Sequence, residues 1–244
     1  MTPSPKTLVF DIEVAGFPWD EVDEATQRYL LKRARNNSDR EAIPERTGLY
    51  PGLGKVIAIG VWCVEDAAGT ILLEGEGPED PNWHLDPGTH IFLGDEAALL
   101  TRFWQMIEDT GGDPDQPPAR VVTFNGRGYD GPMLMVRSAQ LGVAPSRNLV
   151  PNRYGIHDHC DLFDVLTFMG STRDRYSLDY WCRRFDVESS KGSIDGSQVS
   201  GAYRDGRIDE IGQYCMRDVR ATAQLYEKLA PTILPLFKGG PDAE

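Results

Sequence analysis

The sequence lacks the features of membrane, secreted and disulfide-stapled proteins. The longest apolar run, residues 56–64, falls short of the ~18 residues of a membrane span and is interrupted by Gly60. The four cysteines lie far apart and form no Cys-x-x-Cys pair, so we expect reduced thiols rather than disulfides or zinc ligands. Asp11 and Glu13 interrupt the first apolar run, which therefore does not resemble a signal peptide. We expect a cytoplasmic protein with no membrane partner.

A surplus of basic residues is also missing. The chain carries 38 Asp and Glu against 25 Lys and Arg, a formal net charge of -13. This balance argues against a protein that coats nucleic acid or an anionic membrane through bulk charge. It remains compatible with a protein that gathers carboxylates locally to hold metal ions.

The 244 residues have an ordinary globular composition, with 40% hydrophobic residues. Hydrophobic periodicity predicts strands that alternate with helices, which indicates one α/β domain over residues 1–237 and a flexible tail over 238–244. The predicted strands cover residues 7–14, 55–65, 70–74 and 120–124, with a short apolar run at 90–93. The predicted helices cover residues 18–36, 95–109, 132–141, 161–169, 177–185 and 209–229, with an irregular connection over 37–54.

The first strand carries two acids among apolar residues. Side chains alternate along a strand, so Asp11 and Glu13 share one face while Phe10 and Ile12 fill the other. Two neighbouring carboxylates repel each other, and a divalent cation would remove that conflict. The alternative is an amphipathic edge strand whose acidic face is solvated.

Two further segments carry polar groups where ligands often bind. Asn125 and Asp130 follow the apolar strand at 120–124, and the carboxyl ends of strands form the ligand edge of α/β sheets. Ordinary turn and capping chemistry explains the same residues equally well. Tyr214 and Asp218 are four residues apart in the last helix and therefore share one face. A solvated helical Asp is the alternative there.

Together these segments resemble a known family. Asp-x-Glu, Asn-x4-Asp and Tyr-x3-Asp in this order are similar to the DEDD 3′-5′ exonucleases of the ribonuclease H-like superfamily. More narrowly, the chain resembles stand-alone predicted exonucleases related to the proofreading domain of family B DNA polymerases. The resemblance rests on Phe-Asn-Gly-Arg-Gly-Tyr-Asp and four further segments, which are residues 161–166, 177–180, 195–199 and 214–219.

The resemblance implies a fold and a set of site residues. The fold would be a ribonuclease H-like mixed central sheet flanked by helices, in a single domain with an inserted helical segment (17–54) after the first strand. Asp11, Glu13, Asp130 and Asp218 would be the metal-binding acids. Tyr214 would mark the tyrosine subgroup, because Gln213 stands where the histidine subgroup carries its histidine.

The resemblance also implies a mechanism. Two Mg²⁺ or Mn²⁺ ions would activate a water and stabilise the departing 3′ oxygen, releasing 5′-nucleoside monophosphates from single-stranded DNA. Tyr214 would orient the attacking water. Asn125, Arg127 and Tyr129 are candidates for substrate contacts, although Arg127 could be a surface residue of the turn. RNA or short oligonucleotides are alternative substrates, and a non-catalytic module that binds nucleic acid or a protein is the rival function.

Two other clusters have less specific explanations. His157 and His159 share a face of an extended segment, but Cys160 faces away, so we do not favour a zinc site there. Basic residues of the inserted segment form either a solvated helix face or a clamp on the nucleic-acid backbone, and these are Arg28, Lys32, Arg33, Arg35 and Arg40.

Overall fold

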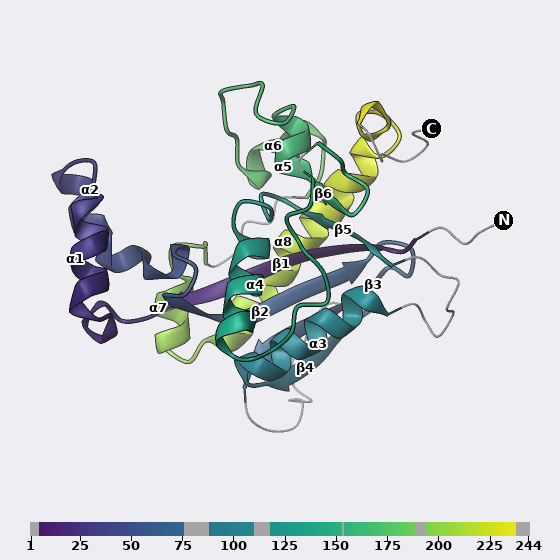
Figure 1. Ribbon diagram of the computed structural model, residues 1–244. Coiled ribbons are helices and arrows are strands. Elements are labelled where there is room, and N and C mark those ends of the chain that lie inside the picture. Colours follow the sequence, from purple (N-terminus) through teal and green to yellow (C-terminus); the bar gives the residue numbers. More distant parts are fainter. Residues whose placement is uncertain (1–4, 76–87, 110–117, 153, 189–193, 238–244) are drawn as a thin grey trace.

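A six-stranded mixed sheet forms the centre of the molecule, in the order β4-β3-β2-β1-β5-β6 (Figure 1). The computed structural model describes residues 5–75, 88–109, 118–152, 154–188 and 194–237. The strands are β1 (Thr7–Gly16), β2 (Gly54–Cys63), β3 (Ala68–Glu74), β4 (Thr89–Gly94), β5 (Arg120–Thr123) and β6 (His159–Asp161). The predicted α/β class, with helices flanking a mixed sheet, is confirmed.

Strand β1 lies inside the sheet rather than at its edge. It pairs antiparallel with β2 on one side and parallel with β5 on the other. Strand β6 continues parallel to β5, while β3 is antiparallel to β2 and β4 is parallel to β3. Strand β2 pairs with β1 from Leu8 to Gly16, whereas β5 pairs only with Thr7, Leu8 and Val9. Both faces of β1 are available for packing.

Helices cover both faces of the sheet (Figure 1). Helices α3 (Glu96–Glu108) and α4 (Asp130–Gln140) bury the face that carries Phe10. The other face, which carries Val9, packs against α8 (Ile208–Leu229) and α5 (Leu162–Leu166). Helix α6 (Leu178–Arg184) packs against α8, and α7 (Val199–Arg204) contacts both α8 and β1.

The segment between β1 and β2 projects from one end of the sheet (Figure 1). It contains η1 (Trp19–Glu21), α1 (Glu24–Lys32), α2 (Asn37–Ala42) and η2 (Pro44–Leu49). The prediction of one helix over 18–36 was wrong at its start, because Asp23 caps α1 by accepting a hydrogen bond from Thr26 N (3.0 Å). The prediction of an irregular connection after it was also wrong, because Asn36 caps α2 through Asp39 N (2.8 Å).

Strand β6 and helix α7 were also not predicted. Strand β6 has three residues and α7 has six, too few for either period to be visible in the sequence. The helix expected over 161–169 is shorter, because Asp161 is its N-cap and Thr167 already leaves helical geometry. The predicted tail at 238–244 lies outside the described residues. Among the helices that the structure describes, none is long and apolar enough to cross a membrane.

Candidate active site

Strand β1 presents Asp11 and Glu13 on one face of the sheet and apolar side chains on the other. Phe10 and Ile12 are 1% and 4% exposed in the core formed with α3 and α4. Glu13 is buried and Asp11 is partly buried on the face toward α8. The alternative of a solvated acidic edge strand was therefore wrong, because β1 is an interior strand and Glu13 is only 7% exposed.

Helix α8 lies close to this acidic face because Gly60 has no side chain. Gly60 pairs with Asp11 across β2 and β1. A Cβ atom at Gly60 would lie 2.8 Å from Val219 Cγ2 and 3.1 Å from Cys215 Sγ, both on α8. The close packing brings Asp218 near enough to contribute to the raised pKa of Asp11, although burial is the larger cause.

Tyr214 lies one helical turn before Asp218 on the same side of α8. Burial raises the pKa of its phenol far above the usual range, and the nearby carboxylates of Asp218, Glu13 and Asp11 raise it further. The hydroxyl lies close enough to the Asp218 carboxylate for the two groups to interact. Tyr214 therefore stays protonated and acts as a hydrogen-bond donor within the acidic cluster.

Asp130 joins the cluster from the first residue of α4. The backbone N–H of Ile12 donates to Asp130 Oδ1 (3.1 Å), and the Asp11 and Asp130 carboxyl groups lie close enough to affect each other's pKa. Burial raises the pKa of Asp130 to about 7. Four acids from three distant segments thus gather at one place, namely Asp11, Glu13, Asp130 and Asp218.

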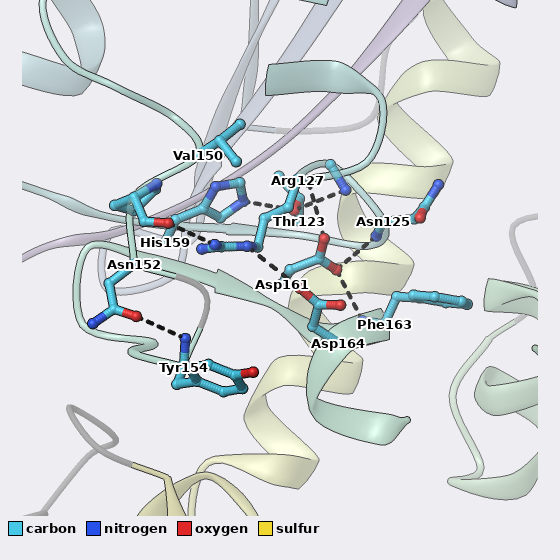
Figure 2. A network of polar contacts seen from close by, with 12 residues as sticks. Thr123, Asn125, Arg127, Val150, Asn152, Tyr154, His159, Asp161, Phe163 and Asp164 are labelled. Carbon is cyan, nitrogen blue, oxygen red and sulfur yellow. Dashed lines mark hydrogen bonds and ion pairs between the residues drawn. The ribbon is translucent and has the colours of Figure 1, made fainter. Parts of the chain in front are cut away.

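Asp161 holds the loop that delivers Asp130 (Figure 2). Its carboxylate accepts backbone N–H groups from Asn125 (2.7 Å) and Arg127 (2.9 Å), and it also caps α5 through Phe163 N (3.0 Å). Burial raises the pKa of Asp161 to about 6, while the N–H donors oppose that change. The loop is thereby fixed although Asn125 has a positive φ of 67°.

His159 lies beside the same loop and contacts Thr123 (Figure 2). One ring nitrogen contacts Thr123 Oγ1 (2.8 Å) and the other contacts the Leu149 carbonyl (2.6 Å). Burial lowers the pKa of His159 to about 4, so the ring is neutral near pH 7. Both ring nitrogens already have protein partners, which is the arrangement of a structural histidine.

The three predicted substrate contacts occupy different environments. Asn125 is exposed at the tip of the loop. Arg127 has a side chain only 7% exposed, with Nη2 donating to the Pro151 carbonyl (2.8 Å) and Nε 3.4 Å from Asp164 Oδ2. Its guanidinium therefore ties the loop to α5, and it is not a surface residue of the turn. Tyr129 is half-buried and donates its hydroxyl to the Gly48 carbonyl (2.8 Å).

The electrostatics of the cluster are unfavourable without a cation. Burial raises the pKa values of Asp11 and Glu13 well above their ordinary range, and the other acids of the cluster raise them further. Two unit charges 4 Å apart repel by about 4 kcal/mol at an effective dielectric constant near 20. Divalent cations relieve such repulsion, and hard carboxylate oxygens are the ligands that Mg²⁺ and Mn²⁺ prefer.

One non-carboxylate group also borders the cluster. The possible ligand atoms of Asp11, Glu13 and Cys215 all lie within 4.8 Å of one another. However, Cys215 Sγ points to the Asp11 carbonyl (3.5 Å), and burial raises the pKa of its thiol well above the usual value. Because thiolates rather than thiols bind metals, only the carboxylates are available as ligands. Carboxylate oxygens fit Mg²⁺ or Mn²⁺.

Comparison with protein families identifies the chain. Residues 53–232 match the family described as the predicted 3′-5′ exonuclease related to the exonuclease domain of PolB. This chain belongs to that family. The resemblance stated from the motifs is thereby confirmed, and membership of this exonuclease family supports a nuclease activity.

Comparison with solved structures supports the fold. The chain is similar to the family B DNA polymerase from the hyperthermophilic archaeon Pyrobaculum calidifontis, with a TM-score of 0.54 and 20% sequence identity. The match covers 94% of this chain and 25% of the polymerase chain. The similarity supports a ribonuclease H-like fold, whereas at this identity it carries no argument about substrate. A comparison with curated proteins finds no match.

A cleft of about 960 Å³ adjoins the carboxylates in this member of the exonuclease family. Glu13 and Tyr129 are among its lining residues, η2 forms one wall, and α7 with the residues before it forms another. Its volume lies in the range of about 300–1,000 Å³ that is usual for small-ligand sites. Of the four acids, Glu13 therefore borders a groove of molecular dimensions.

Sequence reasoning missed two residues that build the site. Gly60 is a glycine inside an apolar strand, a pattern that indicates close approach of another element, but the sequence does not say which element. Asp161 was recognised within a family motif, whereas its hydrogen bonds to the loop at 125–127 depend on β6 and could not be seen. Gly60 allows α8 to pack close to β1, and Asp161 positions the loop at 125–127.

Proposed function

We propose that this protein is a two-metal-ion 3′-5′ exonuclease that hydrolyses the terminal phosphodiester bond of single-stranded DNA and releases 5′-nucleoside monophosphates. One observation carries the proposal, namely the convergence of four acids from β1, α4 and α8 on a site where the pKa values of Asp11, Glu13 and Asp130 rise together. Perturbed pKa values concentrate at functional sites. A purely structural cluster would not collect acids with raised pKa values beside an open cleft.

Asp11, Glu13, Asp130 and Asp218 would hold two Mg²⁺ or Mn²⁺ ions. When bound, such a pair activates water as a nucleophile and stabilises the attacking and departing oxygens of a phosphodiester. The protein contributes by fixing the carboxylates before substrate arrives. Gly60 sets the distance of α8, while Asp161 and the Ile12 N–H fix the position of Asp130.

Tyr214 would orient the attacking water through its hydroxyl. Because its pKa lies far above neutrality, the phenol donates a hydrogen bond and does not remove a proton as a free base. Asn125 is the most accessible of the three proposed substrate contacts. Arg127 and Tyr129 would act on substrate through the loop that they hold, since the Arg127 guanidinium and the Tyr129 hydroxyl both have protein partners.

Digestion of end-labelled strands tests the proposal. Single-stranded DNA, duplex DNA and RNA of the same sequence are incubated with Mg²⁺, with Mn²⁺ or with a chelator, using the wild type and Asp11→Asn. We expect stepwise loss of 3′-terminal nucleotides from single-stranded DNA, dependent on metal and reduced at least about 10³-fold in Asp11→Asn. The asparagine keeps the size of the side chain, which makes it a matched control for packing.

Each alternative predicts a different result. Faster digestion of RNA than of DNA would assign the same chemistry to ribonucleotide ends, because the 2′-hydroxyl is the group that distinguishes the two. Digestion of only very short strands would indicate an oligonucleotidase. Binding of DNA without any metal-dependent cleavage would favour the non-catalytic module and contradict the proposal.

A further inference from the structure

The cleft beside Glu13 has one wall that belongs to the inserted segment. Residues 16–19 and 44–49 line it on this side, and residues 196–207 line it on the other. The basic residues of α1 and α2 are absent from the described lining. Arg28 pairs with Glu24 (3.1 Å) and Arg40 donates to the Leu31 carbonyl (3.0 Å), so these side chains interact within the insert.

The η2 wall is packed directly on the ends of β1 and β2. A Cβ atom at Gly16 would lie 2.5 Å from Gly48 N, and one at Gly54 would lie 3.2 Å from Gly48 Cα. Thr47 Oγ1 also donates to the Phe17 carbonyl (2.8 Å). Contacts this close leave no room for side chains, so η2 is a fixed part of the fold although α1 and α2 project outward (Figure 1).

Both walls are connected to the catalytic elements. Tyr129, the residue before Asp130, donates its hydroxyl to the Gly48 carbonyl of η2 (2.8 Å). The N–H of Gly16, at the end of β1, donates to Ser200 Oγ on α7 (3.1 Å). The groove therefore has a defined width and a defined position relative to the carboxylates of the cluster.

The lining of the cleft is suited to an anionic polymer with aromatic bases. It contains three arginines, and of these Arg46 pairs with Asp39 (3.6 Å) and Arg207 with Glu210 (3.3 Å). Arg204 is exposed, and no other residue in the described part of the chain forms an ion pair or hydrogen bond with its side chain. Trp19 is half-buried on the opposite wall.

We propose that η1–η2 and α7 form the binding site for the unpaired nucleotides next to the scissile bond, with Trp19 stacking on a base and Arg204 contacting a phosphate. Grooves that combine cations with aromatic stacking platforms are the usual sites for single strands. The inference rests on the proposed exonuclease function and adds a reason why that exonuclease would prefer single strands to duplexes. A cleft of about 960 Å³ between two anchored walls has room for a few nucleotides, and we expect it to exclude a paired end.

Kinetics with three substrates test this site. The variants Arg204→Ala and Trp19→Leu are compared with Arg102→Ala, an exposed arginine on α3 away from the cleft. We expect KM for single-stranded (dT)8 to rise about tenfold in the first two variants, with kcat unchanged and no effect in the control. Hydrolysis of bis(p-nitrophenyl) phosphate, which has neither a base nor a second phosphate, should be the same in all proteins.

The salt dependence and the duplex substrate give two further readouts. Arg204→Ala should lower the slope of log affinity against log salt by about one, because one phosphate contact is lost. A blunt duplex should be cleaved far more slowly than (dT)8 by the wild type. Unchanged KM in Arg204→Ala, or cleavage of the blunt duplex at the single-strand rate, overturns the proposed site.

These experiments distinguish a failure of the cleft proposal from a failure of the proposed exonuclease function. If the wild type hydrolyses neither DNA nor the nitrophenyl ester, the exonuclease assignment fails. The cleft is then tested by equilibrium binding of labelled (dT)8 in Ca²⁺, where Arg204→Ala should bind about tenfold more weakly than Arg102→Ala. Equal binding by these two variants overturns the cleft proposal independently of catalysis. Arg204 is exposed, so this variant remains informative even if Trp19→Leu does not fold.

Discussion

The two faces of β1 carry opposite chemistry within the same ten residues. On one face Phe10 is 1% exposed and its ring packs edge-on against Phe103, with centroids 5.1 Å apart. On the other face Asp11 and Glu13 share a buried environment with two more acids. One interior strand can therefore stabilise the fold with alternate residues and hold the proposed metal ligands with the residues between them.

The apolar face offsets an energetic cost that the acidic face creates. Burying a charge without a partner is unfavourable, and the raised pKa values of Asp11 and Glu13 express that cost. The apolar side chains of β1 belong to a large core with α3 and α4. A rigid strand in that core keeps the acids in place even where their mutual repulsion opposes it.

The largest expected effect on stability comes from the apolar face. Phe10→Ala should reduce the free energy of unfolding by about 3–5 kcal/mol, because it removes a fully buried ring and leaves a cavity. Asp11→Asn should leave stability unchanged or raise it in metal-free protein while removing activity. Urea unfolding measures the stability of each variant, and activity per folded molecule measures its catalysis. A severe loss of stability in Asp11→Asn would contradict the division between the two faces.

The acidic face should make metal-free stability fall as pH rises. In the folded protein the pKa of Asp130 is about 7, against about 3.9 for an unperturbed Asp, so the folded state binds the proton more tightly. The resulting stabilisation is complete below about pH 4 and is lost as pH rises through about 7. The slope should be about 1.4 kcal/mol per pH unit for each retained proton.

Thermal unfolding between pH 5 and pH 8 measures this slope, with chelator and with saturating Mg²⁺ or Mn²⁺. The cation should raise the midpoint most at the high end of the range, where the carboxylates are ionised. Asp130→Asn should flatten the metal-free profile, because it removes one of the titrating groups. A metal-free profile that is already flat in the wild type would show that the pKa values of the acids are not raised in the folded state.

The sequence predicted the parts of this comparison that depend on local pattern. Alternation along β1 assigned Asp11 and Glu13 to one face, and helical spacing placed Tyr214 and Asp218 together on the last helix. Both rules act within one element, where geometry is fixed by the backbone. The family motifs then linked these elements to Asp130 before any tertiary contact was known.

The parts that the sequence did not reveal depend on contacts between distant segments. The packing of α8 on Gly60 joins residues more than 150 positions apart, and the hydrogen bonds of Asp161 require a three-residue strand. The η2 wall was expected to be irregular, because its short turns have no hydrophobic period. Its position follows from the close contacts of Gly16, Gly48 and Gly54, which local sequence rules do not address.

The smallest expected effect on activity concerns Tyr214, which lies beside the carboxylates of the acidic face. Tyr214→Phe removes one hydroxyl and keeps the ring, so the carboxylates and their metal affinity should be preserved. We expect kcat to fall about tenfold, the size of one hydrogen bond that orients a reactant, while KM for (dT)8 stays the same. Single-turnover digestion with Mn²⁺ measures this fall, and Mn²⁺ binding to the same variant checks that the site is intact. If turnover equals that of the wild type, Tyr214 belongs with the residues that fill space around the acids, and the reactive part of this face reduces to the carboxylates alone.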